Sequence, residues 1–206
     1  MFQSLFQLPQ VVAWLRYGCH GFAPPIIKRR IIASYLKRFQ IETFVETGTY
    51  LGDTLAFVAR NRGINCVSIE LGERLFDAAK KRFRHHDNVK LLCGDSGALM
   101  AAVVKSAQSP VLYWLDGHYS EGITARGEQE TPIMMELEAI LSAPSHPSVI
   151  LIDDARCFIG QNGYPKLIEL LNFVDDHENY AAEVSVDIVR LIHKSLLFLS
   201  RGQTDS

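Results

Sequence analysis

The chain has 206 residues, of which 48% are hydrophobic and 21% charged, and its mean hydropathy is slightly positive at +0.05. This composition excludes a disordered chain and supplies enough apolar side chains for one buried core. The formal net charge of −2 argues against a nucleic-acid partner, because binding to a phosphate backbone needs a clear basic excess. No apolar run reaches the roughly 18 residues that span a bilayer, so we expect no membrane span and a cytoplasmic protein.

The N-terminal part of the chain differs from the rest. Residues 1–40 are expected to form a helical leader or cap, and residues 41–206 one further domain. The first 17 residues are rich in apolar side chains but lack the basic start and cleavage site of a signal peptide. They predict a helix that covers part of the domain, a lid, or the contact of a possible homodimer.

A second helix is predicted after the Pro24-Pro25 pair. Apolar side chains recur there near helical spacing, at Ile27, Ile31, Tyr35 and Phe39. Basic residues lie between them, and we interpret these as the solvated face of an amphipathic helix: Lys28, Arg29, Arg30, Lys37 and Arg38.

A regular alternation of strands and helices follows. Short apolar runs predict strands over residues 43–47, 66–70, 89–93, 111–116 and 149–153. Helical patterns lie over residues 54–62, 74–84, 132–141 and 165–173. This order predicts a mostly parallel sheet with helices on both faces. Two further strand-like runs, 184–192 and 195–200, are separated by His193-Lys194, a link short enough for an antiparallel hairpin.

Polar residues end each predicted strand, where ligands bind in open α/β sheets. The first strand leads into Glu46-Thr47-Gly48-Thr49-Tyr50-Leu51-Gly52-Asp53-Thr54, in which glycines allow a tight turn and Asp53 or Thr54 can cap the next helix. Glu70 ends the second strand, and a carboxylate there can accept both hydroxyls of a ribose. Asp95 and Ser96 follow the third strand in a polar turn suited to the edge of an adenine.

These residues carry a resemblance to a known family. Glu46-Thr47-Gly48-Thr49-Tyr50-Leu51-Gly52 resembles the first motif of class I S-adenosylmethionine-dependent methyltransferases. Glu70, Asp95 and Asp116 fall where that family places its ribose, adenine and substrate-side residues. The resemblance covers about residues 40–200. It implies a Rossmann-like three-layer α/β sandwich, with a seven-stranded, mostly parallel sheet whose last strand is antiparallel.

The resemblance also implies a cofactor and its contacts. The cofactor is S-adenosylmethionine, bound by Glu46, Thr47, Gly48, Thr49, Gly52, Asp53, Thr54, Glu70, Asp95, Ser96 and Asp116.

Acidic residues after the fourth and fifth strands indicate a second group. Asp116, Asp153 and Asp154 would repel one another unless a cation or a proton intervenes. Oxygen ligands favour Mg²⁺, Ca²⁺ or Mn²⁺, and the arrangement is similar to metal-dependent O-methyltransferases of the catechol and macrolide-sugar types. His118, directly after Asp116-Gly117, is a candidate general base together with Asp116. Tyr119 and Arg126 are candidate substrate contacts in the segment that follows.

The predicted function is methyl transfer to an oxygen of a small hydroxylated molecule with divalent-metal assistance. Metal-independent transfer to nitrogen or to a carboxylate remains open, as does a module that binds S-adenosylmethionine without catalysis. A dinucleotide site is disfavoured because Gly48 and Gly52 do not have G-x-G-x-x-G spacing, and the sequence contains no P-loop motif. A nucleic-acid methyltransferase is disfavoured by the net charge.

Overall fold

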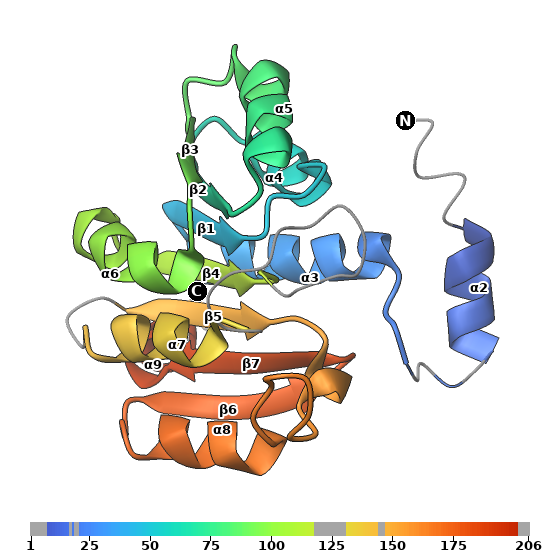
Figure 1. The fold of residues 1–206 in the computed structure, drawn as a ribbon. Helices are drawn as coiled ribbons and strands as arrows, with labels where there is room; N and C mark the ends of the chain where they lie inside the picture. Colours follow the sequence, from blue (N-terminus) through green and yellow to red (C-terminus); the bar gives the residue numbers. More distant parts are fainter. Residues whose placement is uncertain (1–7, 17, 19–20, 118–130, 144–146, 202–206) are drawn as a thin grey trace.

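The computed structural model describes residues 8–16, 18, 21–117, 131–143 and 147–201 (Figure 1). Its centre is one seven-stranded sheet in the order β3-β2-β1-β4-β5-β7-β6, which confirms the predicted architecture. The strands are β1 (Thr43–Thr47), β2 (Asn65–Glu70), β3 (Val89–Cys93), β4 (Val111–Leu115), β5 (Ser148–Ile152), β6 (Tyr180–Ser185) and β7 (Ile188–His193). Strands β1 to β5 pair in parallel, and β7 runs antiparallel to both of its neighbours.

Helices cover both faces of the sheet (Figure 1). One face packs against α3 (Pro25–Arg38), α4 (Asp53–Val58), α5 (Glu73–Phe83) and α9 (Lys194–Arg201), and the other against α6 (Ser96–Ser106), α7 (Ile133–Leu141) and α8 (Leu167–Asp175). Alternation along the strands builds the two cores: Phe44 and Trp114 belong to the first, whereas Val45 and Tyr113 belong to the second. Because both faces are buried, the central strands read as continuous apolar runs.

The closing hairpin lies several residues earlier than the sequence predicts. Its turn is Val186-Asp187, and both residues have positive φ, 56° and 60°. This is the geometry of a two-residue hairpin turn, but a β-branched valine rarely adopts it, so the pattern concealed the turn. The run at 195–200, predicted as a strand, lies in the helix α9. A short apolar run cannot by itself distinguish a strand from a helix.

The leader contains two helices that relate differently to the sheet. The helix α2 (Leu8–Arg16) stands away from the sheet in Figure 1, and Val12 and Leu15 on it are exposed. By contrast, α3 packs Ile32, Tyr35 and Phe39 into the same core as Phe44 of β1. Among the described residues, no helix is long and apolar enough to cross a membrane.

Candidate functional site

The carboxyl ends of β1, β4 and β5 lie next to one another. Thr47 pairs with Leu115, and Leu115 with Ile152, so Asp116 and Asp153 leave neighbouring strands at the same edge. Glu70 ends β2, which pairs with β1 on its other side. The sheet therefore brings together the strand-end acids that the sequence singled out.

The loop after β1 passes unusually close to the end of β4. Gly48 has a φ of 77°, and a Cβ at this position would lie 2.6 Å from the backbone oxygen of Asp116. The Gly48 N–H donates to the carbonyl of Ile69, 2.9 Å away. Only glycine combines this conformation with so close an approach, so the loop is fixed between β2 and β4.

Glu70 fastens the same loop from the side of β2. It is buried, and its Oε2 accepts a hydrogen bond from the Tyr50 N–H at 2.8 Å. Its Oε1 accepts from the Gly72 N–H at 2.9 Å. An ionised carboxylate offers about four lone-pair sites, so each oxygen retains acceptor capacity for a further hydroxyl donor.

Glu46 lies beneath this loop and is almost fully buried, with 2% of its surface exposed. The Ser68 hydroxyl donates to Oε1 of Glu46 at 2.8 Å, and the Thr49 hydroxyl lies 2.6 Å from that of Ser68. Burial raises the pKa of Glu46 to about 8, and the Glu70 carboxylate adds to the rise. The carboxyl group is therefore protonated at neutral pH, and it ends a chain of hydroxyls that leads to the loop.

The turn after β3 is ordered by capping and by a carboxyl group that sequence reasoning missed. Asp95 is the N-cap of α6 and accepts from the Ala98 N–H at 3.1 Å. Glu136 of α7, 1% exposed, hydrogen-bonds the side chains of Ser96 and Thr47, and burial raises its pKa to about 7. Glu136 thus links Ser96 and Thr47, two residues predicted to bind the cofactor. The sequence does not indicate this role, because Glu136 lies within a largely apolar helical segment.

The start of α4 differs from the sequence expectation. Neither Asp53 nor Thr54 is the cap: the N-cap residue is Gly52, in the left-handed conformation, with no side-chain cap bond. The reason is that Gly52 turns the chain with a φ of 75°, which makes Asp53 the first helical residue. Asp53 instead forms an exposed ion pair with Arg82, with 2.9 Å between Oδ1 and Nη1.

The three acids at the ends of β4 and β5 form one cluster. Carboxylate oxygens of Asp116, Asp153 and Asp154 all lie within 4.8 Å of one another. Burial and the neighbouring Asp153 raise the pKa of Asp116 well above its ordinary value. Burial also raises the pKa of Asp153, to about 6, although Lys28 opposes the rise. The sequence prediction that these three side chains converge is thus met.

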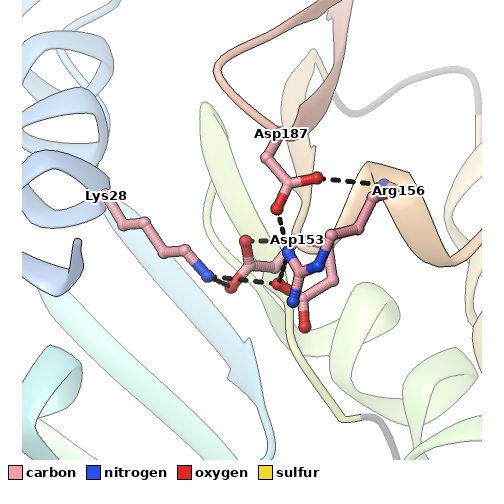
Figure 2. Close-up of polar contacts among 5 residues, drawn as sticks. Lys28, Asp153, Arg156 and Asp187 are labelled. Atoms are coloured by element: carbon pink, nitrogen blue, oxygen red, sulfur yellow. Dashed lines mark hydrogen bonds and ion pairs between the residues drawn. The ribbon is translucent and has the colours of Figure 1, made fainter. Parts of the chain in front are cut away.

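Lys28 from the leader reaches this acidic cluster. Its Nζ lies 2.5 Å from Oδ2 of Asp153 and 3.2 Å from Oδ1 of Asp154 (Figure 2). Only 8% of the residue is exposed, so its placement on a solvated helix face was wrong. The buried stripe of α3 begins with Lys28 and Ile32 in place of the predicted Ile27 and Ile31, and it keeps the predicted Tyr35.

A second cation lies on the other side of the cluster. Arg156 Nη1 is 2.9 Å from Oδ1 of Asp154 and also pairs with Asp187 (Figure 2). Asp187 belongs to the β6–β7 turn and accepts from the Arg156 N–H at 2.9 Å. The turn that the sequence misplaced therefore carries an acid next to the candidate site.

The carboxylates of the cluster suit a hard divalent cation, but the Lys28 ammonium already lies where such an ion would bind. Three carboxylates are the ligand type that Mg²⁺, Ca²⁺ and Mn²⁺ prefer. Two of them already bind the Lys28 ammonium within hydrogen-bond distance. As the residues stand, the cluster accommodates a divalent ion only if Lys28 moves away. The candidate base His118 and the candidate substrate contacts Tyr119 and Arg126 lie outside the described residues.

Several solved structures resemble this chain over most of its length. An O-methyltransferase from Bacillus cereus in complex with S-adenosylhomocysteine matches with a TM-score of 0.60 and 14% identity, over 92% of this chain and 90% of that one. The O-methyltransferase TomG from Streptomyces achromogenes, in complex with S-adenosylmethionine, matches with a TM-score of 0.56 and 12% identity, over 88% and 86%. The chain has the fold of S-adenosylmethionine-dependent methyltransferases. Cofactor-bound Rv0187 from MTB matches with a TM-score of 0.58 and 14% identity, over 90% and 89%.

This likeness shows the fold alone, because the three structures are only 12–14% identical to this chain. No protein-family model matches the sequence, and no curated protein matches it.

Proposed function

We propose that this chain transfers a methyl group from S-adenosylmethionine to an oxygen of a small hydroxylated molecule. One observation carries the proposal: the loop after β1 passes against the end of β4 at Gly48 and is held from the side by Glu70. In this arrangement the backbone of the loop faces the cofactor and the Glu70 oxygens accept the ribose hydroxyls. Asp95 and Ser96 would lie at the adenine, and Asp116 on the acceptor side.

The acceptor side is where the sheet gathers its acids. A hydroxyl that approaches the sulfonium methyl must lose its proton, and positioning along the carbon–sulfur axis supplies much of the rate. Asp116 leaves β4 beside Gly48, and we propose that its side chain orients such a hydroxyl. His118 is proposed as the general base, and Tyr119 and Arg126 as acceptor contacts.

A divalent metal is a separate question, because Lys28 already contacts two of the three carboxylates that would hold it. Asp116, Asp153 and Asp154 would hold the ion, which would act as a Lewis acid on the acceptor oxygen. Activity that persists in EDTA would contradict a role for the metal without contradicting methyl transfer itself. Methylation of amines or carboxylates in the same assay would support metal-independent transfer to nitrogen or carboxyl oxygen instead.

Cofactor binding and turnover test the proposal in sequence. Titration calorimetry with S-adenosylhomocysteine should show one site per chain. Transfer of label from methyl-tritiated S-adenosylmethionine to a panel of catechols, phenols and sugars should then yield a labelled ether. Binding without turnover on any acceptor would favour a non-catalytic module, and absence of binding would refute the assignment.

A further inference from the structure

The acidic cluster contains a cation supplied by the chain itself. Lys28 extends from α3 toward the ends of β4 and β5, and its ammonium contacts Asp153 and Asp154 at 2.5 and 3.2 Å (Figure 2). Asp153 is 1% exposed and Lys28 8% exposed, so water screens this pair only weakly. A buried pair of this kind persists only when both charges are compensated.

The balance of charge explains why a cation is needed here. Asp116, Asp153 and Asp154 lie within 4.8 Å of one another, and Asp187 adds a fourth carboxylate through Arg156. The Lys28 ammonium lies within hydrogen-bond distance of Asp153 and Asp154, and Arg156 lies within hydrogen-bond distance of Asp154. The lysine therefore offsets part of the repulsion among the acids.

An aromatic ring from the leader stabilises the same cation. The Nζ of Lys28 lies 4.4 Å from the centroid of the Phe22 ring, and the guanidinium carbon of Arg156 lies 5.5 Å from it. A cation within about 6 Å of an aromatic face is attracted to it. Two carboxylates and one aromatic ring thus contact the ammonium group.

The Lys28 ammonium and a divalent ion would compete for the same carboxylate oxygens. Mg²⁺ binds carboxylate oxygens at about 2.1 Å, so an ion on Oδ2 of Asp153 would lie within about 4.6 Å of the Lys28 nitrogen. Two cations that close in a poorly solvated cluster repel each other strongly. Metal binding would therefore require the lysine to leave both of its carboxylates.

We propose that the ammonium group of Lys28 is the resident cation of the Asp116, Asp153 and Asp154 cluster and excludes a divalent metal from it. The consequence for this chain is a site that works without a metal, with the acids ordered by a lysine from the leader. The catalytic consequence rests on the proposed function. The metal exclusion does not, because it is measured without cofactor or acceptor.

Manganese binding to the full chain tests the exclusion directly. Free Mn²⁺ is followed by electron paramagnetic resonance in titrations of wild type, Lys28→Met and Lys37→Met. Lys37 is exposed on the same helix and serves as the matched control. We expect wild type and Lys37→Met to bind Mn²⁺ at least about tenfold more weakly than Lys28→Met, which gains one site.

A double variant locates the gained site. Lys28→Met combined with Asp153→Asn should lose the Mn²⁺ affinity that Lys28→Met gains. The thermal midpoint of Lys28→Met should also rise with added MnCl₂, whereas that of wild type should not. Lys28→Gln replaces Lys28→Met if the latter does not fold.

Three results would overturn the proposal. One is a wild-type chain that binds one Mn²⁺ as tightly as Lys28→Met. Another is a Lys28 variant that folds and gains no affinity for the ion. The third is an affinity that survives Asp153→Asn. If no Lys28 variant folds, binding of one Mn²⁺ to wild type that Asp153→Asn abolishes would still overturn the proposal.

Discussion

The buried carboxyl of Glu46 makes a quantitative prediction about how stability depends on pH. Glu46 is 2% exposed and accepts one hydrogen bond from Ser68, and burial raises its pKa from 4.5 to about 8. The folded pKa lies above the unfolded one, so the folded state binds the proton more tightly between these values. The resulting stabilisation is complete below about pH 4.5 and is lost as pH rises through 8.

The magnitude follows from the two pKa values. Each pH unit between 4.5 and about 8 costs about 1.4 kcal/mol of unfolding free energy, or of order 5 kcal/mol in total. Glu46→Gln keeps the shape and an acceptor for Ser68 but cannot ionise. From pH 5 to pH 8, wild type should therefore lose about 4 kcal/mol relative to the variant.

Urea unfolding at half-unit intervals from pH 5 to pH 9 measures this difference. The other buried acids, Glu136 and Asp153, titrate in both proteins, so subtraction isolates position 46. Glu42→Gln, at an exposed site just before β1, controls for the chemical change. A difference between wild type and Glu46→Gln that does not vary with pH would refute a protonated Glu46 in the folded protein.

Three further predictions concern the loop, the ribose acceptor and the hairpin. Gly48→Ala should lower the free energy of unfolding in urea by about 2 kcal/mol or more, because its Cβ would meet the Asp116 backbone oxygen at 2.6 Å. The control Gly63→Ala, whose Cβ would lie 3.4 Å from its nearest atom, should lower it less. Equal losses in the two variants would contradict the close approach at Gly48. Glu70→Gln should weaken S-adenosylhomocysteine binding roughly 10- to 100-fold in calorimetry. The exposed control Glu73→Gln should bind as wild type does. If Glu70→Gln binds as tightly as this control, Glu70 is not the ribose acceptor. Val186→Asn should stabilise the chain by about 1 kcal/mol in thermal unfolding because asparagine tolerates a φ of 56°, and a lower melting temperature would count against this turn geometry.

The sequence predicts the central strands well because β1, β4 and β5 are short, buried on both faces and followed by polar residues. The ranges predicted for β1 and β3 coincide with the strands observed, β2 and β4 differ by one residue at one end, and β5 is shifted by one residue. Parallel register then carries Asp116 and Asp153 to one edge without further assumption. Strand-end chemistry is therefore readable from the sequence, since order along the chain and position at the edge are linked.

The side chains that the sequence misses reach the site from elements whose orientation it does not specify. Lys28 is one of several basic residues on α3, and the sequence does not show that it replaces Ile27 in the buried stripe. Asp187 depends on a turn formed by a valine with positive φ. Glu136 depends on how α7 rotates against the sheet. Each outcome is set by tertiary packing rather than by local propensity.

Lys28 also distinguishes the roles open to the two helices of the leader. Asp153 is 1% exposed, and Lys28 of α3 is its cation partner. Removing one member of a buried ion pair leaves an uncompensated charge, at a cost of about 3–5 kcal/mol. The apolar face of α3 adds to this cost, because Ile32, Tyr35 and Phe39 would leave a shared core. A lid that opens by releasing α3 would therefore disrupt the acidic cluster it covers. In the described part of the chain no contact joins α2 to the cluster, so of the two it is α2 that can serve as a lid or a dimer contact while the site stays assembled.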